Sequence, residues 1–243
     1  LFPLVGQLRA AVEGGELGPV YMAYTYTMGF GHEHEPIRGQ EGALAAIDPS
    51  WYYRAGAGPL PDVTVYALQL ITSVLGPVRQ VTALANLRRP ERSWRGQTIT
   101  IEIADNTAVL MEFASGAIGV AVGSDSVGSA QSPWGGMEIY GARGALVLDD
   151  VDLASGYPVR ATLHGPTPRT IAADLGDQQY LTPNHLAIEE PHVYADIMDL
   201  VDAIRDDRAP RATGEQARHV VEIIERARAA VATGQTQQLT TRF

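Results

Sequence analysis

The sequence predicts an α+β fold, in which one large, predominantly antiparallel open sheet carries helices on one face. Two observations favour this class. Short β-type segments fill the middle of the chain, and the turns between them are too short for the crossovers that parallel strands require. Helical patterns precede and follow this run, which is typical of helices gathered on one layer. There is no internal repeat and no linker, so we expect residues 1–243 to form a single domain.

Four helical segments are indicated by apolar residues spaced three and four apart. The first covers residues 1–12 and ends at Gly14-Gly15, and the second covers residues 59–75. Two more close the chain. One carries an apolar stripe over residues 193–204, and the other follows residues 213–216, whose sequence Thr-Gly-Glu-Gln fits a capping box.

The predicted strands are short runs of β-branched, aromatic and other apolar residues between turn-like pieces. They are Pro19–Met28, Val78–Leu87, Gln97–Ala104, Thr107–Ala114, Ala117–Gly123, Met137–Tyr140, Ala145–Leu148, Val159–Leu163 and Thr170–Ala173. Residues 29–58 instead carry many glycines, prolines and polar side chains. We expect an irregular excursion there, and an excursion of this length is usually functional or disordered.

Composition excludes several classes of function. The formal net charge is -10 and all 18 basic residues are arginines without a basic run, so nucleic acid is not an expected partner. No apolar run reaches the roughly 18 residues of a membrane span. The chain has neither cysteine nor lysine, which excludes disulfides, thiolate chemistry, a Schiff base and a phosphate-loop lysine within it.

Asp62 and Tyr66 are the first candidate catalytic residues. They are four apart near the start of a predicted helix, which places both on one helix face. A carboxylate beside a phenol could position a hydroxyl-bearing substrate and shuttle its proton. Gly56 and Gly58, just before them, permit close approach of a ligand to the backbone. The alternative from the residues alone is that Asp62 only favours the helix dipole and Tyr66 packs in the core.

His32-Glu33-His34-Glu35 is the second feature. In an extended chain both histidines would project to one side, and two imidazoles could hold Zn²⁺ together with a further ligand. No third ligand is identifiable, so we expect no metal site. The segment is then either a solvated acidic loop or a substrate contact.

Trp51, Tyr52 and Tyr53 offer flat apolar faces for a sugar ring. Three consecutive residues cannot all face one pocket, so we expect one or two of them in the core. His192 opens the penultimate helix, where it is either a pocket residue or a histidine near the helix cap.

The segment Gly56–Tyr66 resembles the GGGxxxDxGxH/Y signature of the Gfo/Idh/MocA family of NAD(P)-dependent oxidoreductases. Ala67–Val81, Asp105–Gly119, Met137–Leu148 and the closing helices are similar to the segments that follow in that family, in the same order. The resemblance covers nearly the whole chain. It implies a fold like the C-terminal domain of glyceraldehyde-3-phosphate dehydrogenase.

The resemblance also implies roles for individual residues. The family's aspartate falls on Asp62 and its acid–base His/Tyr on Tyr66, while Ala57 and Thr64 stand where the family often has glycine. Polar and aromatic residues of the excursion and of the penultimate helix are then expected to bind substrate. These are His32, His34, Trp51, Tyr53, Arg54 and His192. Gly56 and Gly58 are expected on the nicotinamide side.

NAD or NADP would be bound mainly by an N-terminal Rossmann domain, which also carries the catalytic lysine of an E-K-P motif. This lysine-free chain also lacks a G-x-G-x-x-G fingerprint, because Gly56-Ala57-Gly58 is followed by Pro-Leu-Pro. We therefore expect part of a longer protein, with residues 1–17 entering from the Rossmann domain, and an inactive chain when alone.

The implied reaction is oxidation or reduction at a CH–OH group of a sugar, inositol or similar polyol. The implied setting is a cytoplasmic homo-oligomer assembled through the sheet face, with no membrane contact. The alternative is a non-catalytic module whose open sheet face serves assembly or binding. A sheet with helices on one face leaves the other face available for association.

Overall fold

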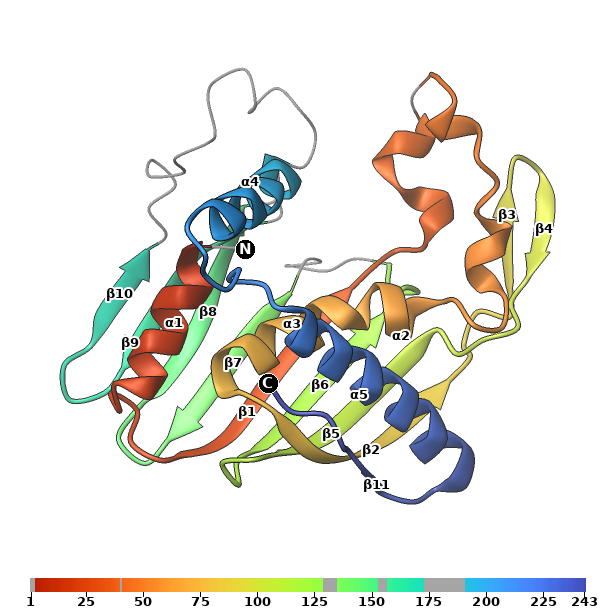
Figure 1. Ribbon diagram of the computed structural model, residues 1–243. Coiled ribbons are helices and arrows are strands. Elements are labelled where there is room, and N and C mark those ends of the chain that lie inside the picture. Colours follow the sequence, from red (N-terminus) through yellow and green to blue (C-terminus); the bar gives the residue numbers. More distant parts are fainter. Residues whose placement is uncertain (1–2, 40, 129–134, 153–156, 173–190) are drawn as a thin grey trace.

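The computed structural model describes residues 3–39, 41–128, 135–152, 157–172 and 191–243. A nine-stranded sheet forms the centre, in the order β10-β9-β8-β7-β1-β6-β5-β2-β11 (Figure 1). Its strands are β1 Val20–Met28, β2 Val78–Asn86, β5 Asn106–Phe113, β6 Ile118–Ser124, β7 Gly136–Gly141, β8 Ala145–Asp152, β9 Tyr157–His164, β10 Arg169–Ala172 and β11 Gln237–Gln238. The predicted α+β class and the predominantly antiparallel sheet are confirmed.

Three of the helices lie along one face of this sheet, as predicted (Figure 1). The α-helices are α1 Pro3–Glu13, α2 Pro59–Asp62, α3 Thr64–Leu75, α4 Pro191–Arg205 and α5 Gly214–Thr233. Of these, α1, α3 and α5 cover the sheet. The predicted cap of α5 forms, because Thr213 Oγ1 accepts a hydrogen bond from the Gln216 N–H at 3.2 Å. None of the described helices combines the length and apolar character needed to cross a bilayer.

β1 is an exception within this predominantly antiparallel sheet, because it pairs with β6 in parallel and with β7 antiparallel. Two expectations about local structure were wrong. The predicted strand Gln97–Ala104 ends at Thr100 and belongs to a separate hairpin of β3 (Glu91–Trp94) and β4 (Gln97–Thr100). The single helix predicted over residues 59–75 is divided at Val63 into α2 and α3.

The excursion over residues 29–58 is built from short 3-10 helices. They are η1 His32–His34, η2 Pro36–Gly39, η3 Leu44–Ala46 and η4 Pro49–Tyr53. Together with the β3–β4 hairpin they form a lobe beyond one end of the sheet, and α2 lies at its base (Figure 1). The lobe has a small core of its own, around Tyr52, Tyr53, Ile99 and Ile101.

Small residues fix α3 against the centre of the sheet. Gly119 and Gly123 of β6 lie under the helix, and a Cβ built on Gly123 would overlap the Thr64 side chain. Thr64 is fully buried there at the start of α3. This close approach holds the backbone of the α2–α3 junction at a defined position above β1 and β6.

The face of the sheet opposite these helices is exposed and largely apolar; we call it the open sheet face. Cross-strand partners Leu110, Val120 and Tyr24 lie side by side on it across β5, β6 and β1. Its large exposed apolar side chains are Met22, Tyr24, Leu84, Leu110, Ile118 and Tyr140.

Candidate functional site

The candidate site lies where the lobe meets α2, and its centre is an ion pair between His32 and Asp62. The 3-10 turn η1 brings His32 Nε2 to 3.0 Å from Asp62 Oδ2, across 30 positions of sequence. Nδ1 of the same ring lies 2.7 Å from Glu35 Oε1. The imidazole thus lies between two carboxylates and is largely covered, with 17% of its side chain exposed.

The charge state of His32 follows from this arrangement. Burial alone would lower the pKa of the imidazole, but hydrogen bonds to Asp62 and Glu35 outweigh burial and raise the pKa to about 9. His32 is therefore a cation at neutral pH. Because the folded pKa lies above the ordinary value, the stability contributed by these contacts is complete below about pH 6.5 and is lost as the pH rises through about 9.

Aromatic residues of η4 form one wall of the site. The Tyr52 ring lies 4.0 Å from the His32 ring, centroid to centroid, and Trp51 lies 5.9 Å from it. Tyr52 and Tyr53 are each 1% exposed, whereas Trp51 is 52% exposed. Two of the three consecutive aromatics are therefore core residues, as predicted, and Trp51 presents an apolar surface to solvent.

A buried ionic cluster lies beneath that wall. The Arg92 guanidinium pairs with Glu33 Oε1 at 3.0 Å and with Asp125 Oδ1 at 2.9 Å, and it lies over the Tyr53 ring at 4.8 Å. The Tyr53 hydroxyl donates a hydrogen bond to Glu33 and accepts one from the His32 N–H at 3.0 Å. Burial raises the pKa of Asp125 to about 6, although the Arg92 charge opposes the change.

Tyr66 lies in the first turn of α3 and is 52% exposed, so its side chain does not pack in the core. The Asp62 side chain is half exposed, and its hydrogen-bond partner is His32. The predicted geometry of His32 and His34 was wrong. In η1 the His32 ring is directed at Asp62, while Glu33 is buried and His34 is exposed.

The remaining predicted site residues fall in different places. Arg54 is exposed on the lobe, and the side chain of His192 lies outside the described residues. Gly56 has a φ of 94° and open space where a Cβ would be, whereas a Cβ on Gly58 would overlap Ile103. Gly58 is therefore required by packing, and Gly56 leaves room for a ligand.

Three charged residues around the site, Arg38, Arg92 and Asp125, were missed by the sequence analysis. Glu33 and Glu35 were singled out there only as members of the His32–Glu35 segment, without roles of their own. Arg38 braces η1 by donating to the His32 carbonyl at 3.1 Å and pairing with Glu35 at 3.0 Å. No local sequence pattern predicts their contacts, because each contact either joins segments that are distant in sequence or depends on the 3-10 turn. Among the described residues no group of three His, Asp or Glu side chains is arranged to hold a metal ion.

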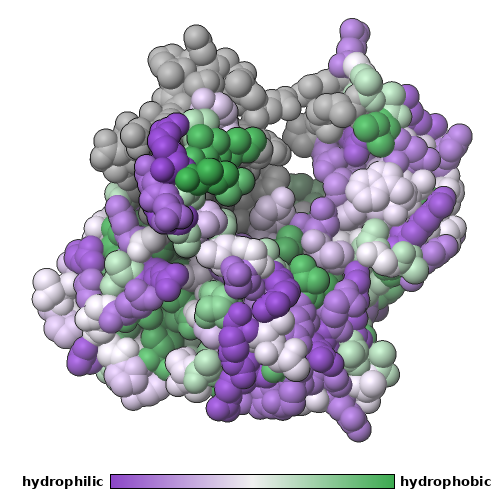
Figure 2. Space-filling view, viewed as in Figure 1, coloured by the Kyte–Doolittle hydropathy of each residue, from purple (hydrophilic) through white to green (hydrophobic). Residues whose placement is uncertain are grey.

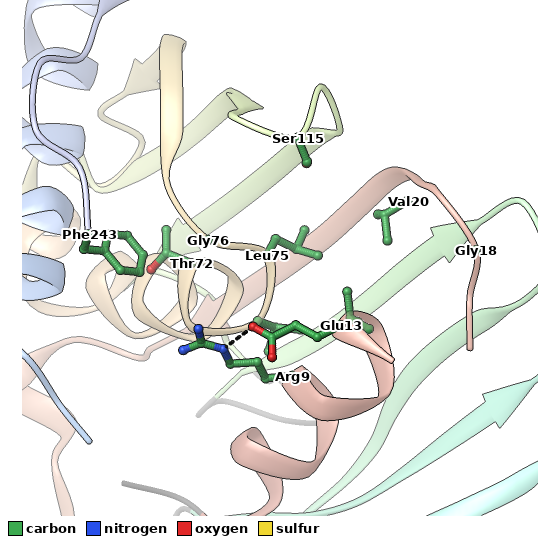
Figure 3. A pocket seen from close by; sticks show the side chains of 11 residues that line it. Arg9, Glu13, Gly18, Val20, Thr72, Leu75, Gly76, Ser115 and Phe243 are labelled. Atoms are coloured by element: carbon green, nitrogen blue, oxygen red, sulfur yellow. Dashed lines mark hydrogen bonds and ion pairs between the residues drawn. The ribbon is translucent and has the colours of Figure 1, made fainter. Parts of the chain in front are cut away.

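A separate cavity of about 260 Å³ lies at the opposite end of α3 (Figure 3). Thr72, Leu75 and Phe243 line it, and the Arg9–Glu13 ion pair lies at its edge. Because Asp62 lies just before α3, Tyr66 lies in its first turn and this cavity lies at its end, the cavity is not part of the candidate site.

The family model for the GFO/IDH/MocA C-terminal domain matches residues 5–147, which is more than half of the chain. The chain belongs to this family. The match includes β1, the whole lobe, α2 and α3, and hence every member of the His32–Asp62 pair and of the Arg92 cluster. No protein of curated function shows a significant sequence match.

Solved structures of oxidoreductases share the fold of this Gfo/Idh/MocA domain. An oxidoreductase from Agrobacterium radiobacter in complex with NAD⁺, L-tartaric acid and magnesium is 18% identical, with a TM-score of 0.70 and 98% of this chain and 62% of that chain covered. Levoglucosan dehydrogenase in complex with NADH is 16% identical, with a TM-score of 0.75 and 98% and 63% covered.

A third structure is the aldose-aldose oxidoreductase from Caulobacter crescentus complexed with glycerol. It is 19% identical, with a TM-score of 0.68 and 98% of this chain and 61% of that chain covered. The Gfo/Idh/MocA chain described here thus spans a little under two thirds of the length of these proteins.

Proposed function

We propose that the chain is the substrate-binding and oligomerisation part of an NAD(P)-dependent oxidoreductase that acts on a CH–OH group of a sugar or similar polyol. The observation that carries this proposal is the His32–Asp62 contact beside the exposed ring of Trp51. Tyr66, the other residue of the family signature, lies four positions after Asp62, in the first turn of α3. Family membership and the sugar dehydrogenases among the similar structures support the substrate class.

In this proposal each side chain has a distinct task. The Tyr66 hydroxyl exchanges the proton of the reacting substrate hydroxyl, and Asp62 accepts a hydrogen bond that orients the substrate. Trp51 covers an apolar face of the sugar ring. The nicotinamide, when bound, accepts or supplies hydride at the carbinol carbon. A lysine from outside this chain would favour the phenolate form of Tyr66, whose ordinary pKa of about 10 makes it a weak base at neutral pH.

Only the nicotinamide end of the cofactor fits this chain. Gly56 offers open space beside α2, so a flat ring can approach its backbone closely. No glycine-rich turn for the pyrophosphate occurs in the sequence, because Pro59 follows Gly58 directly. The pyrophosphate and the adenosine would therefore be held by residues outside this chain, which is also where the choice between NAD and NADP would be made.

We expect the isolated 243-residue chain to bind polyols weakly and to show no saturable binding of NAD(H) or NADP(H). Titration with glycerol or levoglucosan, followed by the NMR signal of the Trp51 indole, should give millimolar binding that Trp51→Ala weakens at least several-fold. Calorimetry tests the dinucleotides. Micromolar dinucleotide binding, or polyol binding unaffected by Trp51→Ala, would contradict the proposed division of roles.

The second part of the proposal is that the chain assembles through the open sheet face. Assembly would also be the function of the chain if it were a non-catalytic module. The specific observation is the row Leu110, Val120 and Tyr24, which leaves an apolar surface across three strands. Large exposed apolar surfaces of this kind favour association between protein chains.

Leu110→Glu is expected to dissociate the assembly, because it places a charge in the middle of the open sheet face. Light scattering should then fall from a multiple of 26.1 kDa to 26.1 kDa itself. Val221→Glu is the matched control, since Val221 is 58% exposed on α5, on the helical side of the molecule. A wild-type chain that is monomeric at micromolar concentration would argue against the open sheet face as an interface.

A further inference from the structure

We propose that His32 is a positioning residue that fixes the Asp62 carboxylate, and that it is itself held by a buried relay of Tyr53, Glu33 and Arg92. This inference rests on the proposed function, because it explains how the site keeps its geometry. The relay runs through the lobe and joins the candidate site to Asp125, which follows β6 of the main sheet.

Asp62 needs such a support. It ends α2, which has only four residues, and its side chain is half exposed. One turn of helix is too short to be stable by itself, so α2 alone cannot hold the carboxylate in one place. The His32 Nε2–Asp62 Oδ2 contact at 3.0 Å ties the carboxylate to a second element. Productive geometry of a substrate-orienting group is worth large factors in rate, because small misplacements are costly.

His32 is in turn fixed at several atoms. Its N–H donates to the Tyr53 hydroxyl at 3.0 Å, its carbonyl accepts from Arg38 Nε at 3.1 Å, and its ring packs on Tyr52. Both ring nitrogens face carboxylate oxygens, one from Asp62 and one from Glu35. Because Nε2 is hydrogen bonded to Asp62 and Nδ1 faces Glu35, the ring is held in place, and this geometry favours a positioning role for His32 over a general-base role.

The relay below His32 converges on Glu33. The backbone N–H of His32 donates to the Tyr53 hydroxyl, and this hydroxyl donates to the Glu33 carboxylate, which also accepts a hydrogen bond from Arg92. Hydrogen bonds that follow one another in this way polarise and strengthen each other at low local dielectric. Arg92 then reaches Asp125, directly after β6, so the relay ends at the frame of the main sheet.

Burying the three charges of this cluster is energetically costly. The side chains of Arg92, Glu33 and Asp125 are 0–2% exposed, and buried ion pairs contribute little net stability compared with well-packed apolar residues. A role in holding one geometry accounts for the retention of three buried charges. Gly31 supports this interpretation, because a Cβ there would overlap Arg92 Nη1 and the Glu33 carboxylate, so the backbone is shaped around the ion pair.

The positioning role predicts a pH signature. Loss of the proton from His32 removes the cation that holds Asp62, so kcat/KM should fall as the pH rises through about 9. Ionisable and polar groups from every neighbouring element bear on this titration. They are Asp62 of α2, Glu35 after η1, Arg38 of η2, Tyr52 and Tyr53 of η4, and Asp125 after β6.

The first experiment is an NMR titration of His32 in the chain without substrate or cofactor. We expect Tyr53→Phe, which removes one hydroxyl and keeps the ring, to lower the pKa of His32 by about one unit, because the backbone contact that sets its distance to Asp62 is lost. Glu33 stays paired with Arg92 in this variant. Tyr52→Phe is the matched control. Tyr52 is equally buried, but its hydroxyl makes no hydrogen bond to the rest of the described chain, so the pKa should not move.

The second experiment measures kcat/KM against pH in the complete, cofactor-bearing enzyme. His32→Gln keeps an N–H donor for Asp62 but cannot titrate, so the fall near pH 9 should disappear, with kcat/KM about 10-fold lower at neutral pH. A merely structural residue would change Tm without removing that limb. An unchanged alkaline limb in His32→Gln, or an unchanged His32 titration in Tyr53→Phe, would overturn the inference. Inactivity of the enzyme toward polyols would instead contradict the proposed function. The NMR titration of His32 needs no substrate, so its result is independent of that outcome.

Discussion

Tyr66→Phe is expected to lower kcat by roughly 10²–10⁴, the usual contribution of one general acid–base group. The substitution removes only a hydroxyl. Tyr66 is 52% exposed in the first turn of α3, so its ring contributes little to the core and Tm should hardly change. Loss of turnover without loss of stability would show that the Tyr66 hydroxyl takes part in the reaction and not in the stability of the fold. The measurement is kcat and Tm on the same sample of the complete enzyme.

Tyr21→Phe provides the matched control for this experiment. Tyr21 is 59% exposed and lies at the start of β1, at the other end of that strand from the lobe. Its variant should keep both turnover and Tm. Near-wild-type turnover in Tyr66→Phe would remove Tyr66 from the mechanism and leave the reaction to groups outside this chain.

Arg92→Met is expected to lower the free energy of unfolding by about 3–5 kcal/mol, the usual cost of removing one partner from a buried ion pair. The variant leaves Glu33 and Asp125 buried close together without a cation. Because burial already raises the pKa of Asp125 to about 6, lowering the pH neutralises the Asp125 carboxylate. The loss should therefore be larger at pH 8 than at pH 5. Denaturant unfolding at the two pH values measures both effects.

Arg95→Met separates this effect from a general loss of arginine on the hairpin. Arg95 lies three positions further along, is exposed, stacks over Trp94 at 4.5 Å and donates a hydrogen bond to the Ala45 carbonyl at 3.2 Å. An exposed cation–π contact contributes about 0.5–1 kcal/mol and a hydrogen bond about 0.5–1.5 kcal/mol, so the variant should lose at most about 2 kcal/mol, and the same amount at both pH values. An equal loss in the free energy of unfolding in the two variants would show that removing Arg92 from the buried cluster is no more destabilising than removing an exposed arginine.

Local patterns were sufficient for most of the sheet, but not for its pairing. β5 (Asn106–Phe113) is close to the predicted strand Thr107–Ala114, but its apolar run Ala-Val-Leu-Met does not reveal which residues are buried and which are exposed. The β3 strand could not be recognised, because Glu91–Trp94 carries charged residues and Arg92 turns inward to partners far along the chain. A buried arginine looks like a solvated one until its carboxylates are placed.

Part of the candidate site could likewise be predicted from the sequence and part could not. Asp62 and Tyr66 were predicted because both belong to a family signature within one short segment. The His32 contact does not, because it spans 30 positions and requires the 3-10 turn that replaces the extended chain expected there. The division of the helix at Val63 also escaped prediction, since residues 59–75 keep helical spacing across it.

The place of β1 has a consequence for how the chain folds. This strand comes early in the sequence, yet it is inserted between β6 and β7, which are made long after it. During synthesis one edge of Val20–Met28 has no partner until β6, which ends at residue 124, has left the ribosome, and the other edge has none until β7, which ends at residue 141, has followed. Pairings between such distant segments slow folding into the millisecond-to-second range, and a waiting apolar strand is prone to aggregation. The yield of folded protein should therefore depend strongly on temperature and on the rate of expression.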